Sequence, residues 1–354
     1  MKKIGFIIGS MKGGGAERVI SVLSDKLSNE GYDVSILILR GGDIEYNLNK
    51  NINIVSIYES KSKIKRFFIT IIKLSKYMKT LDCDIYISFC TLENITSCIA
   101  KIFSNKKLII SERNAPNKTS KLTKLLKMMT YRNADGYVFQ TNQAKEYYSD
   151  SIQSKSTVIA NPLKEDLPDR FIGIRKKEIV AVGRLVSQKN YPLLLESFAE
   201  FNKIYDDYTL SIYGKGPLEE DLNHLCKKLG IEKSVKFKGF SKNIHKEILK
   251  SSMYIMTSDY EGMPNALMEA MAIGLPVIST NCPSGGPQEL IINGQNGFLI
   301  DVNSKNQLVE KMIEIANNKE LADRLSESAN KIKFKYNVET IFEEWKKYID
   351  YIIL

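Results

Sequence analysis

Short apolar runs, each typical of a buried β-strand, alternate with helical stretches along the whole chain. In the first half they fall at residues 4–9, 34–39, 85–89, 108–111 and 136–140. In the second half they fall at residues 178–182, 210–213, 235–237, 253–257, 277–280 and 298–300. This alternation predicts an α/β fold with helices on both faces of parallel sheets. Such sheets bind ligands beyond the carboxyl ends of their strands.

Residues 159–168, IANPLKEDLP, interrupt the alternation with two prolines and three charged side chains. A chain of 354 residues is long enough for two domains of ordinary size. We therefore expect two doubly wound, Rossmann-like domains, residues 1–165 and 166–337, that face each other across a cleft. The last stretch, residues 338–354, is predicted to be a helix around Trp345.

The composition, with 43% apolar and 26% charged residues, is that of a globular protein. No apolar run approaches the roughly 20 residues that span a bilayer, and the start MKKIGFIIGS reaches Gly13 too early for a signal peptide. The five cysteines form no C-x-x-C pair, and there are only two histidines. These features favour a cytoplasmic location, reduced thiols and no structural zinc.

The net charge of +10 arises wholly in the first 170 residues, where Lys and Arg outnumber Asp and Glu by 27 to 17. One basic stretch, interleaved with apolar residues, contains Lys61, Lys63, Lys65, Arg66, Lys73, Lys76 and Lys79. A second set recurs at every third residue, at Lys118, Lys121, Lys124 and Lys127. On helices these sets would form basic stripes beside apolar ones, which favours an anionic membrane surface as partner. A solvated helix face is the plainer interpretation, and the second set could instead hold phosphates of a substrate.

Residues 258–272, SDYEGMPNALMEAMA, place Glu261 and Glu269 eight residues apart around a helix expected at residues 264–273. Glu261 would lie in the loop before this helix. Glu269 would lie within it, among apolar residues, where a carboxylate needs polar partners. A ribose diol could supply two donors to Glu269, and the N–H groups at the helix start would favour a diphosphate. A surface helix with one charge is the alternative, which a buried strand at residues 277–280 disfavours.

The run KEIVAVGRLVSQKNYPLLLESF reads as strand, loop and helix, with Arg184 and Lys189 in the loop. Two cations beside a helix start suit a nucleotide-sugar diphosphate, although two solvated basic residues would look the same. Gly14 and Gly15, after the first strand, would let a ligand approach backbone N–H groups, and Gly214 marks a second tight turn. Neither G-x-G-x-x-G with a ribose-binding acid nor a P-loop is present, so a nicotinamide cofactor is not expected. The motif Asp82-Cys83-Asp84 lies at the amino end of a predicted strand, so we assign it to solvation rather than to a metal site.

These motifs, followed by GLPVISTNCPSGGPQELI and NGQNGFLI, resemble retaining glycosyltransferases of family 4, which have the GT-B fold. The resemblance covers most of the chain and is greatest to bacterial enzymes that extend lipid-linked oligosaccharides, capsules or O-antigens. It implies a metal-independent transfer of a hexose or N-acetylhexosamine from a UDP-sugar to a saccharide on undecaprenyl diphosphate, at the inner face of the cell membrane. It also implies that the first domain binds the acceptor, the second binds the donor, and the last helix crosses back to the first. Glu261 would hold the donor sugar with Arg184 and Lys189 as its catalytic partners, and Glu269 would hold the ribose. The other donor-binding residues would be Gly14, Gly15, Gly214, Gly262, Met263, Pro264, Asn265, Ala266 and Leu267.

The acceptor side is less clear, because the first half lacks the histidine that many family members carry there. Glu112 and Arg113, after a predicted strand, are the best substitute, with Lys118, Lys121 and Lys124 beside them. An exposed ion pair is the alternative for Glu112 and Arg113. His224 and His245 are expected to be structural or exposed. Two other functions stay open: a GT-B enzyme acting on a soluble acceptor or free nucleotide sugar, and a basic nucleic-acid-binding protein. The latter is disfavoured because no recognition motif or stacking platform occurs.

Overall fold

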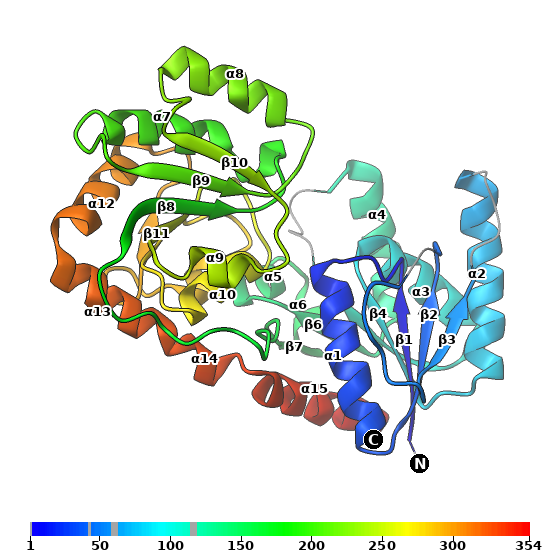
Figure 1. Cartoon of the computed structure of the whole chain (residues 1–354). Coiled ribbons are helices and arrows are strands. Elements are labelled where there is room, and N and C mark those ends of the chain that lie inside the picture. The colour runs from blue at the N-terminus through cyan, green and yellow to red at the C-terminus, as the bar shows by residue number, and fades with distance from the viewer. Residues whose placement is uncertain (1, 42–43, 58–62, 114–118) are drawn as a thin grey trace. The chain divides into compact units, whose positions relative to one another are not determined.

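A computed structural model describes residues 2–41, 44–57, 63–113 and 119–354. The chain divides into two compact units, one made of Met1–Pro162 and Val338–Leu354 and the other of Leu163–Asn337. Each unit contains one parallel β-sheet (Figure 1), so the predicted α/β architecture of two Rossmann-like folds is confirmed.

The sheet of the first unit has the strand order β3-β2-β1-β4-β5-β6-β7. Its strands are β1 (Lys3–Ile8), β2 (Asp33–Ile38), β3 (Asn53–Ser56), β4 (Ile85–Phe89), β5 (Lys107–Ser111), β6 (Gly136–Phe139) and β7 (Ser156–Val158). Its helices are α1 (Gly15–Asn29), α2 (Lys63–Thr80), α3 (Thr91–Ser104), α4 (Lys121–Thr130), η1 (Tyr131–Asn133), α5 (Asn142–Glu146), α6 (Asp150–Gln153) and α15 (Val338–Ile353). The strand order reverses between β1 and β4, which is where a doubly wound sheet opens a ligand crevice.

The sheet of the second unit has the order β10-β9-β8-β11-β12-β13 and reverses between β8 and β11. Its strands are β8 (Lys176–Val182), β9 (Thr209–Tyr213), β10 (Val235–Gly239), β11 (Ser251–Met256), β12 (Val277–Thr280) and β13 (Phe298–Ile300). Its helices are η2 (Ser187–Lys189), α7 (Tyr191–Asn202), α8 (Glu219–Leu229), α9 (Ile244–Ile248), α10 (Asn265–Ala272), α11 (Gly286–Leu290), α12 (Lys305–Asn317), α13 (Lys319–Asn330) and α14 (Ile332–Lys335). All the strands expected from apolar runs are present. Among the described residues the prediction missed β3 and β7, two short edge strands with no fully buried residue.

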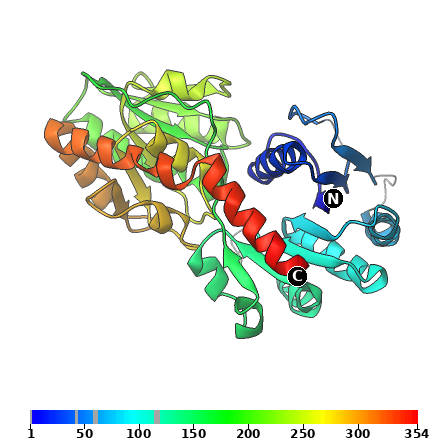
Figure 2. The same ribbon diagram turned by 90° about the horizontal axis from the view of Figure 1, so that it is seen from below.

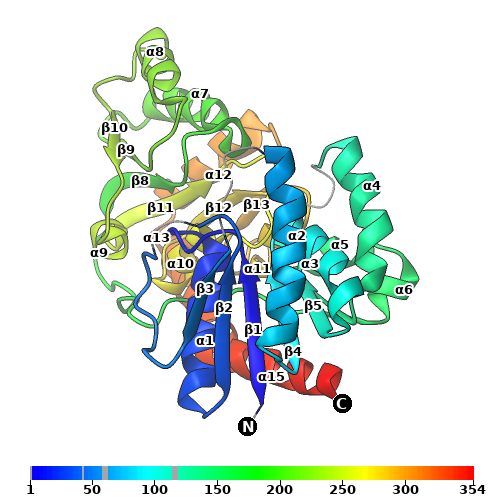
Figure 3. The same ribbon diagram turned by 90° about the vertical axis from the view of Figure 1, so that its right-hand side faces the viewer.

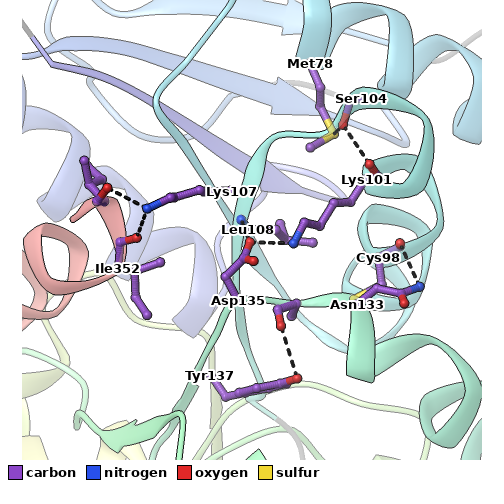
Figure 4. Close-up of polar contacts among 12 residues, drawn as sticks. Met78, Cys98, Lys101, Ser104, Lys107, Leu108, Asn133, Asp135, Tyr137 and Ile352 are labelled. Atoms are coloured by element: carbon purple, nitrogen blue, oxygen red, sulfur yellow. Dashed lines mark hydrogen bonds and ion pairs between the residues drawn. The ribbon is translucent and has the colours of Figure 1, made fainter.

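Helix α15, the last of the chain, packs on the first unit, where α1 and α15 lie on one face of the sheet and α2 and α3 on the other (Figure 2). Its Trp345 is fully buried and stacks on Phe89 of β4, with 5.6 Å between the ring centroids. At the helix end, Lys107 Nζ donates to the carbonyl oxygens of Ile352 and Ile353 at 2.7 and 2.6 Å (Figure 4). A cation there satisfies orphan carbonyls and complements the negative end of the helix dipole.

Helices α2, α3 and α4 contact one another in sequence along one face of the first sheet (Figure 3). Their outer surface is unusually apolar: Phe68 and Ile72 of α2, and Leu122, Leu125, Met128 and Met129 of α4, are each more than half exposed. The expectation that Lys127 belongs to an exposed basic stripe is wrong, because its side chain is buried. Of the other lysines in that set, Lys121 and Lys124 are exposed, and Lys118, like Lys61, lies outside the described residues. No helix among the described residues is long and apolar enough to cross a membrane.

Candidate active site

The second sheet gathers the predicted donor-site residues at its point of strand reversal, beyond the carboxyl ends of β8 and β11 (Figure 1). Arg184 follows β8 and is exposed, and Lys189 closes the 3-10 turn η2. Glu261 follows β11 and is almost fully buried. Residues distant in sequence therefore meet where a doubly wound sheet binds its ligand.

Lys189 and Glu261 form an ion pair, with 2.5 Å between Nζ and Oε1 and only 17% and 11% of the side chains exposed. Hydrogen bonds join the turn that carries Lys189 to the chain after β11. Thr257 Oγ1 donates to the carbonyl oxygens of Lys189 and Asn190, and Asn190 Nδ2 donates to Asp259 Oδ1 at 2.8 Å. Because these bonds fix both loops, Lys189 and Glu261 are held in place before any ligand binds.

Glycines allow the loops around this ion pair to approach closely. Gly214, with φ of 143°, passes so near the carbonyl of Gly183 that a Cβ at position 214 would collide with it. Gly286, after β12, approaches the carbonyl of Gly262 in the same way. Side chains at either position would therefore push apart the loops that follow neighbouring strands.

Glu269 lies in α10, whose buried residues are otherwise apolar, and its carboxylate has a histidine partner. His245 of α9 donates from Nε2 to Glu269 Oε2 at 2.8 Å, and the two side chains are 11% and 12% exposed. The expectation of a structural role for His245 did not include this contact. A polar partner for Glu269 was required by its apolar helix, but nothing in the sequence identified which residue would supply it.

Helix α10 starts one residue later than predicted. Pro264 takes the N-cap position in an extended conformation, and the helix begins at Asn265. The N–H groups of Asn265, Ala266 and Leu267 therefore belong to the first turn of the helix, where backbone donors have no intrahelical acceptor. Gly262 and Met263 lie in the short loop between Glu261 and this first turn. Gly274, with φ of 73°, ends the helix as predicted.

In the first unit, Gly14 is the N-cap of α1 and Gly15 its first residue, at the carboxyl end of β1. Tyr46 donates from its hydroxyl to the Gly14 carbonyl oxygen at 2.9 Å and so fixes this loop. At the opposite end of the sheet, Asp84 accepts a hydrogen bond from the Lys3 N–H and Asp82 pairs with Lys106. The Asp82–Asp84 segment thus lies at the amino end of β4, as predicted.

Glu112, expected near the acceptor, is 3% exposed, and its carboxylate has four side-chain partners. Lys127 of α4 forms an ion pair with its Oε2 at 2.8 Å. Hydroxyls donate to the same carboxylate from Thr91 at 2.6 Å, Tyr131 at 2.7 Å and Tyr148 at 3.4 Å. The exposed ion pair considered as an alternative is therefore wrong, and this charge pair instead ties α4 to the strand end and to α3.

Arg113 also makes interior contacts. Its guanidinium lies 4.8 Å from the ring centroid of Phe89 and 5.6 Å from that of Trp345, and Nη1 donates to Asn161 Oδ1 at 2.8 Å. Burial lowers the pKa of Arg113 to about 10. The side chain therefore fastens α15 to the sheet through cation–π contacts. Of the remaining acceptor-side residues, Lys121 and Lys124 lie on the outer surface of α4, and His224 of α8 is exposed.

Comparisons with known proteins cover almost the whole chain. Residues 13–167 match Glycosyltransferase Family 4, and residues 165–332 match Glycosyl transferases group 1. An uncharacterized glycosyltransferase of Haemophilus influenzae is 32% identical over 98% of this chain and 99% of its own length. A Campylobacter jejuni relative, 28% identical over 99% of this chain and 98% of its own, is named "GalNAc-alpha-(1->4)-GalNAc-alpha-(1->3)-diNAcBac-PP-undecaprenol alpha-1,4-N-acetyl-D-galactosaminyltransferase". The solved structure of Anabaena HepE in complex with UDP and glucose has a similar fold, with a TM-score of 0.85, 17% identity, and coverage of 99% of this chain and 100% of that chain.

Proposed function

The chain is a glycosyltransferase of the family 4 and group 1 type with the GT-B fold, and we propose that it moves a hexose or N-acetylhexosamine from a UDP-sugar to a saccharide on undecaprenyl diphosphate. The second unit binds the donor and the first binds the acceptor. Transfer retains the anomeric configuration and needs no metal. The Campylobacter relative, whose name specifies an undecaprenol-linked substrate, and the UDP complex of HepE support this choice of substrates.

The observation that carries this proposal is the ion pair of Lys189 with Glu261 at the reversal point of the second sheet, with Arg184 exposed just after β8 and Glu269 in the helix that follows. Arg184 and Lys189 bind the donor diphosphate and offset the charge that it gains as the glycosidic bond breaks. Glu261 accepts hydrogen bonds from hydroxyls of the donor sugar. Glu269, held by His245, accepts them from the ribose.

With two cations and the start of α10 beside the diphosphate, the leaving group is stabilised without a divalent metal. In the proposed reaction, the departing phosphate oxygen takes the proton of the acceptor hydroxyl as that hydroxyl attacks from the same face. The products are then UDP and the extended saccharide. This step needs no additional general base.

The acceptor proposed is anchored in the cytoplasmic face of the membrane, so the enzyme must work at a lipid surface. The exposed apolar residues of α2 and α4 define a surface, which we call the apolar helix face: Phe68, Ile69, Ile72, Leu122, Leu125, Met128 and Met129. Lys76, Lys121 and Lys124 are exposed on the same two helices. Apolar side chains beside lysines suit shallow insertion between anionic headgroups.

Donor binding is the first test, with Glu269→Gln as the diagnostic variant and Glu220→Gln, an exposed acid in α8, as its control. We expect UDP-sugars, but not GDP- or ADP-sugars, to raise the melting temperature of wild type and control in the presence of EDTA. Glu269→Gln removes the charge that accepts the ribose hydrogen bonds, which are worth about 1.5–3 kcal/mol in total, so UDP should bind at least tenfold more weakly. Slow hydrolysis of the stabilising UDP-sugar identifies the sugar.

Equal stabilisation of wild type and Glu269→Gln by UDP would remove the ribose role from Glu269. A response that appears only when a divalent metal replaces EDTA would contradict the metal-free mechanism. If no nucleotide sugar binds, the donor assignment as a whole is wrong.

A further inference from the structure

The first sheet has its own reversal point, between β1 and β4, and a cavity of about 260 Å³ opens beside it. The cavity lies between α2 and α3, which are neighbours in Figure 3. Its lining residues come from the chain directly after β2 and from the N-terminal halves of the two helices: Leu39, Arg40, Phe67, Thr70, Leu92, Glu93 and Thr96. None of them was a candidate in the sequence.

An ion pair forms the polar part of this cavity. Arg40 Nη2 lies 2.7 Å from Glu93 Oε1, and Glu93 is 3% exposed whereas Arg40 is 47% exposed. The pair lies across the end of β1, because a Cβ at Gly9 would collide with both the guanidinium and the carboxylate. Burial raises the pKa of Glu93, and Arg40 opposes that shift. Glycine at position 9 thus makes room for a charged pair directly at the reversal point.

The residue that leads into α3 is strained. Cys90 has φ of 77° and ψ of 152°, a backbone conformation that side-chain-bearing residues rarely adopt. Its N–H donates to the Ser111 carbonyl oxygen at 3.1 Å, so the turn is fixed to β5. Strained residues of this kind gather at functional sites. Here the strain sets the direction of the α3 first turn, which carries Leu92 and Glu93 into the cavity wall.

We propose that this cavity binds a saccharide ring of the acceptor. This proposal rests on the proposed function, and it assigns the lining residues of the cavity to acceptor binding. The Arg40 guanidinium has five N–H donors and the Glu93 carboxylate has several acceptor sites, so the pair can bond to neighbouring sugar hydroxyls. Phe67, Leu39 and Leu92 supply apolar walls for the C–H faces of the ring. A volume just below the range of about 300–1,000 Å³ for larger ligands fits one sugar ring better than a nucleotide sugar.

The charge of the site distinguishes a sugar from the other parts of the acceptor. Arg40 and Glu93 together are neutral, so they offer no net attraction for a diphosphate. A polyprenyl chain in the cavity would cover the ion pair without bonding to it, and covering an ion pair with hydrocarbon is costly. Glu112, first expected to serve the acceptor, already has an ion-pair partner in Lys127. Arg113 donates from Nη1 to Asn161, but its Nε and Nη2 atoms are buried without a hydrogen-bond partner among the described residues.

The test measures transfer of labelled sugar into membranes from cells that lack this enzyme and so accumulate its acceptor. Leu92→Trp fills the cavity from a residue that is 46% exposed. Glu93→Gln removes the negative charge that pairs with Arg40. The controls are Ile102→Trp, at the far end of the same helix, and Arg132→Gln, an exposed cation of the first unit. UDP binding and melting temperature are recorded for every variant, so that a damaged second unit or an unfolded protein is recognised.

Two competitors are added in parallel: the acceptor saccharide released by mild acid, and undecaprenyl phosphate.

We expect the KM for the membrane acceptor to rise at least tenfold in Leu92→Trp and Glu93→Gln and to stay unchanged in the controls. The released saccharide should inhibit wild type and fail to inhibit Leu92→Trp. Unchanged KM values in both variants would overturn the assignment. It would also be overturned if Leu92→Trp were no longer inhibited by undecaprenyl phosphate but were still inhibited by the saccharide. A wild type that binds UDP but labels no lipid would contradict the proposed acceptor class itself, which is a separate result.

Discussion

At the scale of one residue, Glu269 must carry a charged carboxylate inside an apolar helix. Its carboxylate must stay charged to accept hydrogen bonds from a ribose, yet the helix around it is apolar and disfavours a charge. His245 offsets the cost of a charge in this apolar helix, because its Nε2–H donates a hydrogen bond to one carboxylate oxygen at 2.8 Å. We therefore regard His245 as a positioning residue, which acts on the donor only through Glu269.

Replacing His245 should weaken recognition of the ribose specifically. We expect wild type to bind UDP about tenfold more tightly than 2′-deoxy-UDP, since one hydrogen bond to a charged group is worth about 1.5 kcal/mol. In His245→Phe this ratio should fall to about two, because the carboxylate loses its orientation. Isothermal titration calorimetry with both nucleotides measures the ratio directly.

His224→Phe, which changes the only other histidine at an exposed position, is the matched control and should keep the tenfold ratio. His245→Gln retains an N–H donor and should restore part of it. A His245→Phe protein that binds both nucleotides more weakly by the same factor would indicate a purely structural role.

The sequence suggested which residues would form the proposed donor site but not how they are held. Glu261 and Glu269 could be proposed from their spacing around an apolar helix, and Arg184 and Lys189 from their place in a loop between a strand and a helix. The Lys189–Glu261 ion pair could not, since it depends on hydrogen bonds from Thr257 and Asn190 between loops that are distant in sequence. On the acceptor side the burial of Glu112 was not foreseen, because its partner Lys127 appeared to belong to a surface stripe.

At the scale of elements, the rotation of α4 about its axis decides what the helix presents to solvent. A lysine ladder predicted a basic face. The pair with Glu112 instead buries Lys127, whereas Lys121 and Lys124 stay exposed. Leu122, Leu125 and Met128 also point outward, with more than half of each side chain exposed. A helix that buries a lysine and exposes leucines is costly in water alone, which favours an apolar partner for its outer surface.

The apolar helix face should bind lipid. Changing Leu125 and Met128 together to Ser removes two large apolar side chains, each worth about 1.5–3 kcal/mol when fully buried. We expect at least a tenfold loss of partitioning onto vesicles of phosphatidylcholine and phosphatidylglycerol, measured by sedimentation. Ile204→Ser, at an exposed site of the second unit, should have no effect. If the double variant sediments like wild type, the lipid contact lies elsewhere on the protein.

At the scale of the whole molecule, the chain begins and ends in the same unit. The strands of both sheets except β3 and β7 could be predicted from apolar runs. The return of α15 to the first unit was expected only from the family resemblance, because it depends on tertiary contacts that no local pattern reveals. Five of its residues are buried: Val338, Ile341, Phe342, Trp345 and Ile349. Ion pairs of Lys2 with Asp350 and of Lys346 with Glu30 join the helix to the opposite end of the chain.

Ending the chain after Asn337 should therefore unfold the first unit and spare the second. Burial of five apolar side chains is worth about 1.5–3 kcal/mol each, which together is comparable with the roughly 5–15 kcal/mol that typically stabilises a domain. Arg184, Lys189, Glu261 and Glu269, the residues proposed to hold the nucleotide, lie within Leu163–Asn337, so the shortened protein should still bind UDP. Limited proteolysis with mass spectrometry should show rapid cleavage within residues 1–162 and a resistant fragment from about residue 163, which UDP protects further. Removal of the exposed Leu354 alone should change neither result, and a truncated protein whose first unit resists proteolysis would show that α15 is dispensable for its folding.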